Sequence, residues 1–179
     1  KAMETNYEKQ AMDFLEKTGC KMTITYKENR KYFLDDKEAR DVYEIEIVRG
    51  SRAWSFEFGN SIKDSEFVAV CGERRYKIPS EMRTKSNSEI TLYVKRNLQS
   101  DFGTVKADHI KRPIPPSEYS VLACLTKYDP GSLEDFCDEF GYDSDSKTAD
   151  RVYAAVKEEW LNVCRIWNDQ EIEELSEIQ

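Results

Sequence analysis

Few residues in this chain have the types and spacing that enzyme chemistry requires. His109 is the only histidine among 179 residues, so a zinc site built from histidine and cysteine is not expected. The five cysteines are widely spaced and form no C-x-x-C pair, which favours free thiols in a reducing compartment over disulfides. The sequence contains no G-x-x-x-x-G-K-[ST] or G-x-G-x-x-G run that could hold a phosphate. We therefore expect no enzymatic activity, no metal and no cofactor, since an enzyme would have to work with carboxylates and tyrosines alone.

The acidic stretch 142–146 has the composition of a calcium loop. An EF-hand loop that began at Asp143 would need glycine and glutamate where the chain has Thr148 and Ala154. The metal interpretation fails on these two positions. We expect instead a turn whose acids favour the start of the following helix.

Acidic residues dominate the C-terminal third of the chain. Residues 114–179 contain 5 Lys and Arg against 16 Asp and Glu, a net charge of −11, whereas the preceding residues contain 22 against 19, a net charge of +3. Acids on rigid helices can occupy a basic nucleic-acid channel and speed association by steering, although a merely solvated face is the plainer alternative. The residues expected to contact such a partner are Asp135, Asp138, Glu139, Asp143, Asp145, Glu173 and Glu174.

Cations gather with aromatic or apolar neighbours in residues 61–112, where Lys and Arg exceed Asp and Glu by 11 to 7. This combination is typical of arms that bind nucleic acid. Lysine and arginine on edge strands also discourage aggregation without any ligand, so that interpretation stays open. The candidates for nucleic-acid contact are Arg74, Arg75, Lys95, Arg96, Lys111 and Arg112.

The elements that must position these residues begin with a helix and three strands in residues 1–60. Thr5 and Glu8 form a predicted capping box for the helix, and Gly19 ends it. Period-two alternation predicts strands with short connections, hence an antiparallel meander whose aromatic face helices cover, an α+β fold. The predicted strands are 22–26, 43–48 and 53–58, with a charged loop at 28–41.

Residues 61–112 are predicted to be an inserted, β-rich arm with strand-like runs at 66–70 and 90–94. The expected organisation is a helix and meander in 1–60, the basic arm in 61–112, and an acidic helical lobe in 113–179 that completes the same core. The short antiparallel sheet would pack against the N-terminal helix and this lobe.

The C-terminal lobe is organised around an apolar helix that follows Ser117, its predicted N-cap. The run 121–125 is apolar on every side, so other elements must cover it all round. A short helix capped by Ser132 and a long helix over 147–167 follow, and the long helix has an apolar stripe at four- and three-residue steps. This stripe favours packing within a monomer, with a dimer interface as the alternative.

Four segments resemble a widespread group of small proteins encoded by phages and other mobile elements of gut bacteria. They are 7–19, 49–55, 58–62 and 119–146, so the resemblance covers both ends of the chain and omits the basic arm. Some small phage proteins of this kind are anti-CRISPRs, and this chain is similar in size, acidity and helical C-terminus to inhibitors of type II RNA-guided nucleases. The resemblance carries no catalytic residue with it.

These patterns together favour a non-enzymatic inhibitor of a host nucleic-acid enzyme, such as a CRISPR nuclease, that works through its acids. The alternative is a phage accessory protein that touches DNA or RNA directly through the basic arm. No apolar run approaches the roughly 18 residues needed to cross a bilayer. We therefore expect a protein of the bacterial host cytoplasm with no membrane partner.

Overall fold

A computed structural model of the chain describes residues 6–30, 40–97 and 105–178. It confirms the α+β fold, with α-helices and two small antiparallel sheets of three strands each. The described residues divide into two compact units. Unit 1 takes in Lys1–Ile24, Glu44–Phe56 and Pro116–Gln179, and unit 2 takes in Thr25–Tyr43 and Glu57–Pro115. None of the helices in these described ranges is long and apolar enough to cross a membrane.

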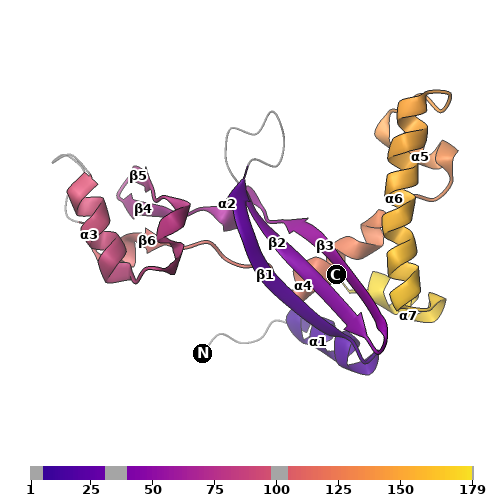
Figure 1. The fold of residues 1–179 in the computed structure, drawn as a ribbon, viewed down its shortest axis with the longest axis horizontal. Coiled ribbons are helices and arrows are strands. Elements are labelled where there is room, and N and C mark those ends of the chain that lie inside the picture. The colour runs from indigo at the N-terminus through magenta and orange to yellow at the C-terminus, as the bar shows by residue number, and fades with distance from the viewer. Residues whose placement is uncertain (1–5, 31–39, 98–104, 179) are drawn as a thin grey trace. The chain divides into compact units, whose positions relative to one another are not determined.

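The first sheet has the strand order β1-β2-β3, with β1 at Lys21–Arg30, β2 at Arg40–Arg49 and β3 at Arg52–Gly59 (Figure 1). The predicted meander is therefore confirmed. Gly50, at φ +58°, lies in the two-residue connection between β2 and β3. A tight hairpin of this kind needs positive φ, which glycine adopts without steric cost.

Helix α4, Glu118–Leu125, lies in unit 1 and is largely covered, although Ala123 and Cys124 of its apolar run are only half-buried rather than covered all round. Val121, Leu122 and Leu125 have no exposed surface, and α4 packs against α1, Asn6–Lys17, and α7, Asp169–Ser176. The predicted cap is confirmed, because the hydroxyl of Ser117 accepts a hydrogen bond from the backbone N–H of Ser120 at 3.2 Å. The N-terminal capping residue Thr5 lies outside the described residues.

The longest helix, α6, spans Lys147–Ile166 and begins at Ser146, whose hydroxyl accepts from the Ala149 N–H at 3.0 Å. Helix α5, Leu133–Phe140, packs beside the N-terminal half of α6, and α7 lies at its other end (Figure 1). Twenty residues at about 1.5 Å each separate these two ends by about 30 Å.

A bidentate ion pair joins the β2–β3 hairpin to the C-terminal helices inside unit 1. Arg49 donates from Nη1 and Nη2 to the two carboxylate oxygens of Glu171 at 2.7 and 2.8 Å, and Nη1 also donates to the Ile166 carbonyl at 2.9 Å. Glu171 in turn accepts from the backbone N–H of Asn168, which completes the capping box of α7. Segment 49–55 of the resemblance therefore begins with an arginine whose side chain holds the fold together.

Unit 2 has its own sheet in the order β5-β4-β6, with β4 at Val68–Cys71, β5 at Arg74–Lys77 and β6 at Ile110–Lys111. Both pairings are antiparallel. The predicted insertion, 61–112, falls inside this unit, which also contains the short helix α2, Ile62–Ser65. A separate buried core holds it together, formed by Phe67, Ala69, Ile78, Ile90, Val94 and Val105.

The prediction of a strand at 90–94 is wrong, because these residues lie in helix α3, Asn87–Asn97. Ile90 and Val94, four residues apart, are fully buried on one face of α3. Ser86 and Glu89 begin this helix as a capping box, each side chain accepting from the other residue's N–H. The strand prediction followed the β-branched residues at 90, 91 and 94 and overlooked this capping box.

We expect Glu171→Gln to lower the free energy of unfolding by about 1.5–3 kcal/mol at neutral pH, since it removes a charged hydrogen-bond acceptor from a largely covered site. The hydrogen bonds from Arg49 lower the pKa of Glu171 below 4.5, its ordinary value. The unfolded chain therefore binds the proton more readily, so this stabilisation is fully present above pH 4.5 and is lost as the pH falls through the lowered pKa.

Urea unfolding followed by tryptophan fluorescence measures this difference, because all three tryptophans, Trp54, Trp160 and Trp167, belong to unit 1. The matched control is Glu173→Gln, an exposed glutamate on the same helix, which should change stability by less than about 0.5 kcal/mol. A loss at Glu171→Gln that persists unchanged at acid pH would contradict the role of the charge.

Candidate binding surfaces

Helix α5 and the turn that follows it present five of the predicted acids to solvent. Asp135, Asp138, Glu139, Asp143 and Asp145 are all exposed. Ser132 begins α5 by accepting from the Asp135 N–H at 3.1 Å, as predicted, and Gly141 ends it at φ +74°. Asp143 accepts from the backbone N–H of Asp145 at 3.1 Å, so this acid also fixes the turn before α6.

An apolar hollow of about 670 Å³ opens beside these acids, and the sequence analysis missed it. Phe136 is its buried floor, and Tyr142 stacks on that ring at 5.9 Å between centroids. Phe140 is 60% exposed and Tyr142 is 38% exposed. The lining residues are Thr126, Lys127, Asp129, Pro130, Phe136, Glu139, Phe140, Tyr142, Val152 and Val156.

The segment that contains α5 and forms one side of this hollow is strongly acidic. Residues 129–145 contain seven Asp and Glu and no Lys or Arg, and Lys127 is the one cation among the lining residues. Apolar surface bordered by charged residues is the composition of a protein-binding patch, with a desolvated centre and a polar rim.

The two remaining predicted acids, Glu173 and Glu174, lie on α7 at the other end of α6 (Figure 1). Glu174 forms an ion pair with Lys17 at 2.9 Å, and Glu173 is exposed. The seven acids proposed as one partner surface therefore form two groups, and the larger one is at α5.

The six basic candidates have different environments in unit 2. Arg75 and Lys111 each bond to Glu66 at 2.6 Å, and the hydrogen bond from Lys111 is the main cause of the lowered pKa of Glu66. Arg112 donates to the Asn87 side chain and to the carbonyls of Arg83 and Lys85, so its guanidinium holds the chain before α3. Arg75, Lys111 and Arg112 thus already bind other parts of the protein.

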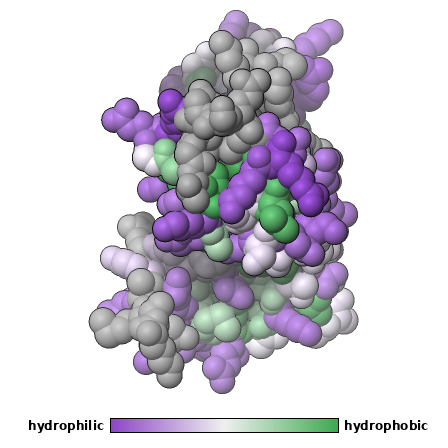
Figure 2. All heavy atoms as spheres, turned by 90° about the vertical axis from the view of Figure 1, so that its left-hand side faces the viewer, coloured by the Kyte–Doolittle hydropathy of each residue, from purple (hydrophilic) through white to green (hydrophobic). Residues whose placement is uncertain are grey.

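The other three basic candidates, Arg74, Lys95 and Arg96, are exposed. Lys95 and Arg96 lie in the last turn of α3, where positive charge is favourable, and neither forms an ion pair with any residue that the structure describes. Figure 2 faces α3, β4 and β5, and hydrophilic side chains predominate among its coloured atoms.

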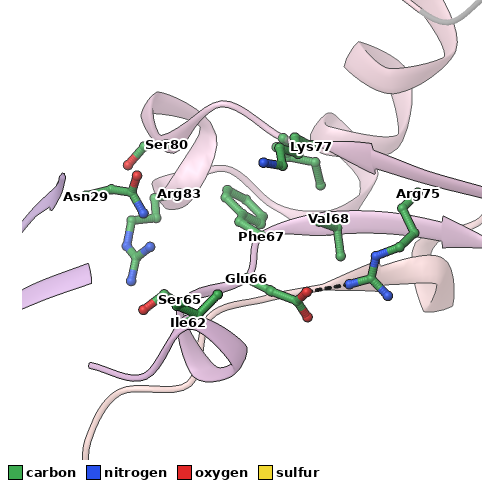
Figure 3. Close-up of a pocket in the computed structure, with 11 residues that line it drawn as sticks. Asn29, Ile62, Ser65, Glu66, Phe67, Val68, Arg75, Lys77, Ser80 and Arg83 are labelled. Carbon is green, nitrogen blue, oxygen red and sulfur yellow. Dashed lines mark hydrogen bonds and ion pairs between the residues drawn. The ribbon is translucent and has the colours of Figure 1, made fainter. Parts of the chain in front are cut away.

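A second cavity, of about 330 Å³, lies within unit 2 (Figure 3). Its charged lining residues are Glu66, Arg75, Lys77 and Arg83. In the view of Figure 3, Asn29 and Arg83 lie on one side of the Phe67 ring and the Glu66–Arg75 ion pair lies on the other. The remaining lining residues are Ile62, Ser65, Phe67, Val68, Ile78, Ser80 and Asn29.

The carboxylate of Asp41 holds Arg83 in the wall of this cavity. The sequence analysis predicted that Asp41 lies in the charged loop 28–41. Asp41 lies instead in β2 and is fully buried. Its two oxygens accept from Arg83 Nη1 and Nη2 at 3.2 and 2.9 Å, and one also accepts from the Asn29 amide at 2.9 Å. Residues 31–39, the middle of the predicted loop, lie outside the described residues.

The phenol of Tyr43 accepts from Arg83 Nη2 at 3.0 Å, and the guanidinium lies 3.9 Å from the centroid of the Tyr26 ring. Burial raises the pKa of Tyr43, and the Arg83 charge opposes that rise. The side chains of Asp41, Arg83 and Tyr43 thus bond to one another, and these bonds hold the wall of the cavity in place.

No catalytic or metal-binding constellation appears among the residues that the structure describes. His109 accepts at Nδ1 from the backbone N–H of Lys106 at 3.0 Å, a local contact at the end of a turn. In the same ranges no group of three or more His, Cys, Asp or Glu could hold a metal ion. The absence of enzymatic activity stays a prediction.

We expect Asp41→Ala to destabilise unit 2 by about 3–5 kcal/mol, because it leaves the Arg83 charge largely covered without its partner. Arg83→Met removes the other half of the pair, and the double variant should lose less than the sum of the single losses. Far-ultraviolet circular dichroism with amide hydrogen exchange of β4 and α3 measures the effect. Asp108→Ala, at an exposed position, is the control, and equal losses at both aspartates would contradict the network.

Comparisons of the chain with protein-family models, with curated proteins and with solved structures find no match.

Proposed function

We propose that this protein is a non-enzymatic binding protein that inhibits a host nucleic-acid enzyme, with a type II RNA-guided nuclease as the first partner to test. The observation that carries the proposal is the group of exposed acids on α5 and its following turn, Asp135, Asp138, Glu139, Asp143 and Asp145, arranged beside an apolar hollow. The partner class comes from the resemblance to small phage proteins, some of which are anti-CRISPRs, and from the similarity in size, acidity and helical C-terminus to inhibitors of type II RNA-guided nucleases.

The physical case rests on complementarity with a basic nucleic-acid channel. Such a channel is lined with lysine and arginine that bind a phosphate backbone, and five carboxylates on a capped helix and its turn offer it fixed negative charge in place of phosphate. Opposite charge steers the encounter and fixes the register of the complex. The exposed rings of Phe140 and Tyr142 add the apolar area that charged contacts alone lack.

Direct binding of DNA or RNA through the basic candidates is the second candidate function. Its support is the exposure of Arg74, Lys95 and Arg96. It would have to act with three fewer candidates, because Arg75, Lys111 and Arg112 are engaged within unit 2. Its affinity should fall steeply with salt in proportion to the phosphates neutralised.

The test is a binding and DNA-cleavage assay with a guide-loaded type II nuclease. We expect the triple variant Asp138→Asn, Glu139→Gln, Asp143→Asn to weaken binding by about tenfold or more, equivalent to about 1.4 kcal/mol. Phe140→Ser should weaken it as well without unfolding the protein, since this ring is 60% exposed. The control triple variant Asp13→Asn, Glu16→Gln, Glu158→Gln removes the same charge from exposed positions elsewhere in unit 1 and should bind as the parent does.

A pull-down from a bacterial host lysate, with and without nuclease treatment, extends the test to other partners. Recovery of one nucleic-acid enzyme that survives the treatment, and that the α5 triple variant fails to capture, supports the proposal. Recovery of only nucleic acid and its bound proteins, all lost on treatment, would contradict it and favour direct binding. Equal weakening by the control triple variant would show that net charge alone, and not this surface, is responsible.

A further inference from the structure

We infer that the cavity of unit 2 is a binding site for a small organic anion, a molecule with one carboxylate or phosphate group on an apolar body. This site lies in a different unit from the acidic surface of α5 and does not depend on the function proposed there. The inference rests on the positions, charges and partners of the lining side chains in Figure 3.

Strand β5 supplies two of the cations because alternate residues of a strand face the same side. Arg75 and Lys77 both line the cavity, whereas Tyr76 between them packs against the core of unit 2. Lys77 has no hydrogen bond or ion pair with any residue in the described ranges, and its side chain extends from β5 in the close-up (Figure 3). An ammonium with three unused donors at the mouth of a cavity is suited to an anionic group.

The cavity has an excess of positive charge even after its internal ion pairs are counted. The lining cations are Arg75, Lys77 and Arg83, and Lys111 is bonded to the same carboxylate as Arg75. Among the described residues, three of these four cations form ion pairs, with Glu66 or the buried Asp41, an excess of two positive charges in this set. This excess lies in a chain whose net charge is −8. A concave, partly covered site of one sign concentrates ions of the other.

The neutral part of the lining indicates the rest of the ligand. Ile62, Phe67, Val68 and Ile78 form apolar walls. The Ser65 hydroxyl and the Asn29 amide bond to Asp41, and the Ser80 hydroxyl bonds to the Tyr26 phenol. The cations of β5 therefore remain to contact the anionic group. The volume of about 330 Å³ is near the lower limit of ligand pockets and suits a molecule with a single ring.

The test is a titration of the full chain, labelled with nitrogen-15 and observed by nuclear magnetic resonance, with phenyl phosphate and benzoate as probes. We expect saturable shifts at the amides of β5 and at Phe67 and Val68. Lys77→Gln should weaken binding by about tenfold, because it removes the unpaired charge from the site. Benzyl alcohol, which has the ring without the charge, and inorganic phosphate, which has the charge without the ring, should both bind more weakly.

The matched control is Lys95→Gln, which removes an exposed lysine of the same unit from α3, outside the cavity lining. It should leave the affinity for phenyl phosphate unchanged. Equal weakening by Lys95→Gln, or shifts spread over all basic regions, would overturn the site in favour of unspecific attraction. Binding of inorganic phosphate as tightly as phenyl phosphate would overturn the assignment of an organic anion, and no saturable shift at β5 would overturn the inference entirely.

Discussion

The burial of the Asp41 carboxylate sets the constraint on which unit 2 depends. A fully covered negative charge is tolerable only where a cation and hydrogen-bond donors surround it. Arg83 supplies the cation, Asn29 supplies a further donor, and the backbone N–H of Asp41 bonds to Ser65. The two carboxylate partners come from β1 and from the 3-10 helix Ser80–Thr84, and the Ser65 hydroxyl that accepts from the Asp41 backbone belongs to α2. Satisfying one carboxylate therefore positions one wall of the cavity in the same step.

Unit 1 uses the same chemistry for a different task. Arg49 and Glu171 are 122 residues apart, and their bidentate pair holds the β2–β3 hairpin to the start of α7. An arginine fork fits a carboxylate in one plane and fixes direction as well as distance. In both units, arginine that the sequence shows only as surface charge is committed to internal contacts. The residues outside such ion pairs carry the charge that a partner could contact. This charge is mostly negative in unit 1 and positive around the cavity of unit 2.

The features that the sequence predicted correctly are those that depend on neighbouring residues. The predicted caps Ser117 and Ser132 bond to backbone N–H groups three residues away, and the apolar positions of α4 and α6 follow from local spacing. The helix at α3 was missed because β-branched residues at 90, 91 and 94 suggest a strand when their capping box is ignored.

Contacts between distant segments account for the other differences between sequence and structure. The partners Asp41 and Arg83 are 42 residues apart, and nothing in the local pattern around either residue indicates the other. The acids of α5 were predicted as exposed charge, and they are exposed. The apolar hollow beside them depends on how α5 folds back onto α6, which brings Phe140 and Val152 to one cavity. Periodicity describes one helix at a time and does not show such a pairing.

The placement of charge on α5 is unfavourable for the helix itself and is consistent with the binding role proposed for it. Glu134 and Asp135 lie in its first turn, where the helix dipole favours them, but Asp138 and Glu139 lie in its last turn, where no basic residue offsets them. Each negative charge at that end destabilises the helix by about 0.3–1 kcal/mol, because it interacts unfavourably with the helix dipole. Like charges at spacings of three and four residues, such as Asp135 with Asp138 and Glu139, repel one another as well. An eight-residue helix with this pattern is less stable than a neutral one would be. In the complex that we propose, cations of the partner would lie near these carboxylates and would offset both the repulsion among them and their unfavourable interaction with the helix dipole.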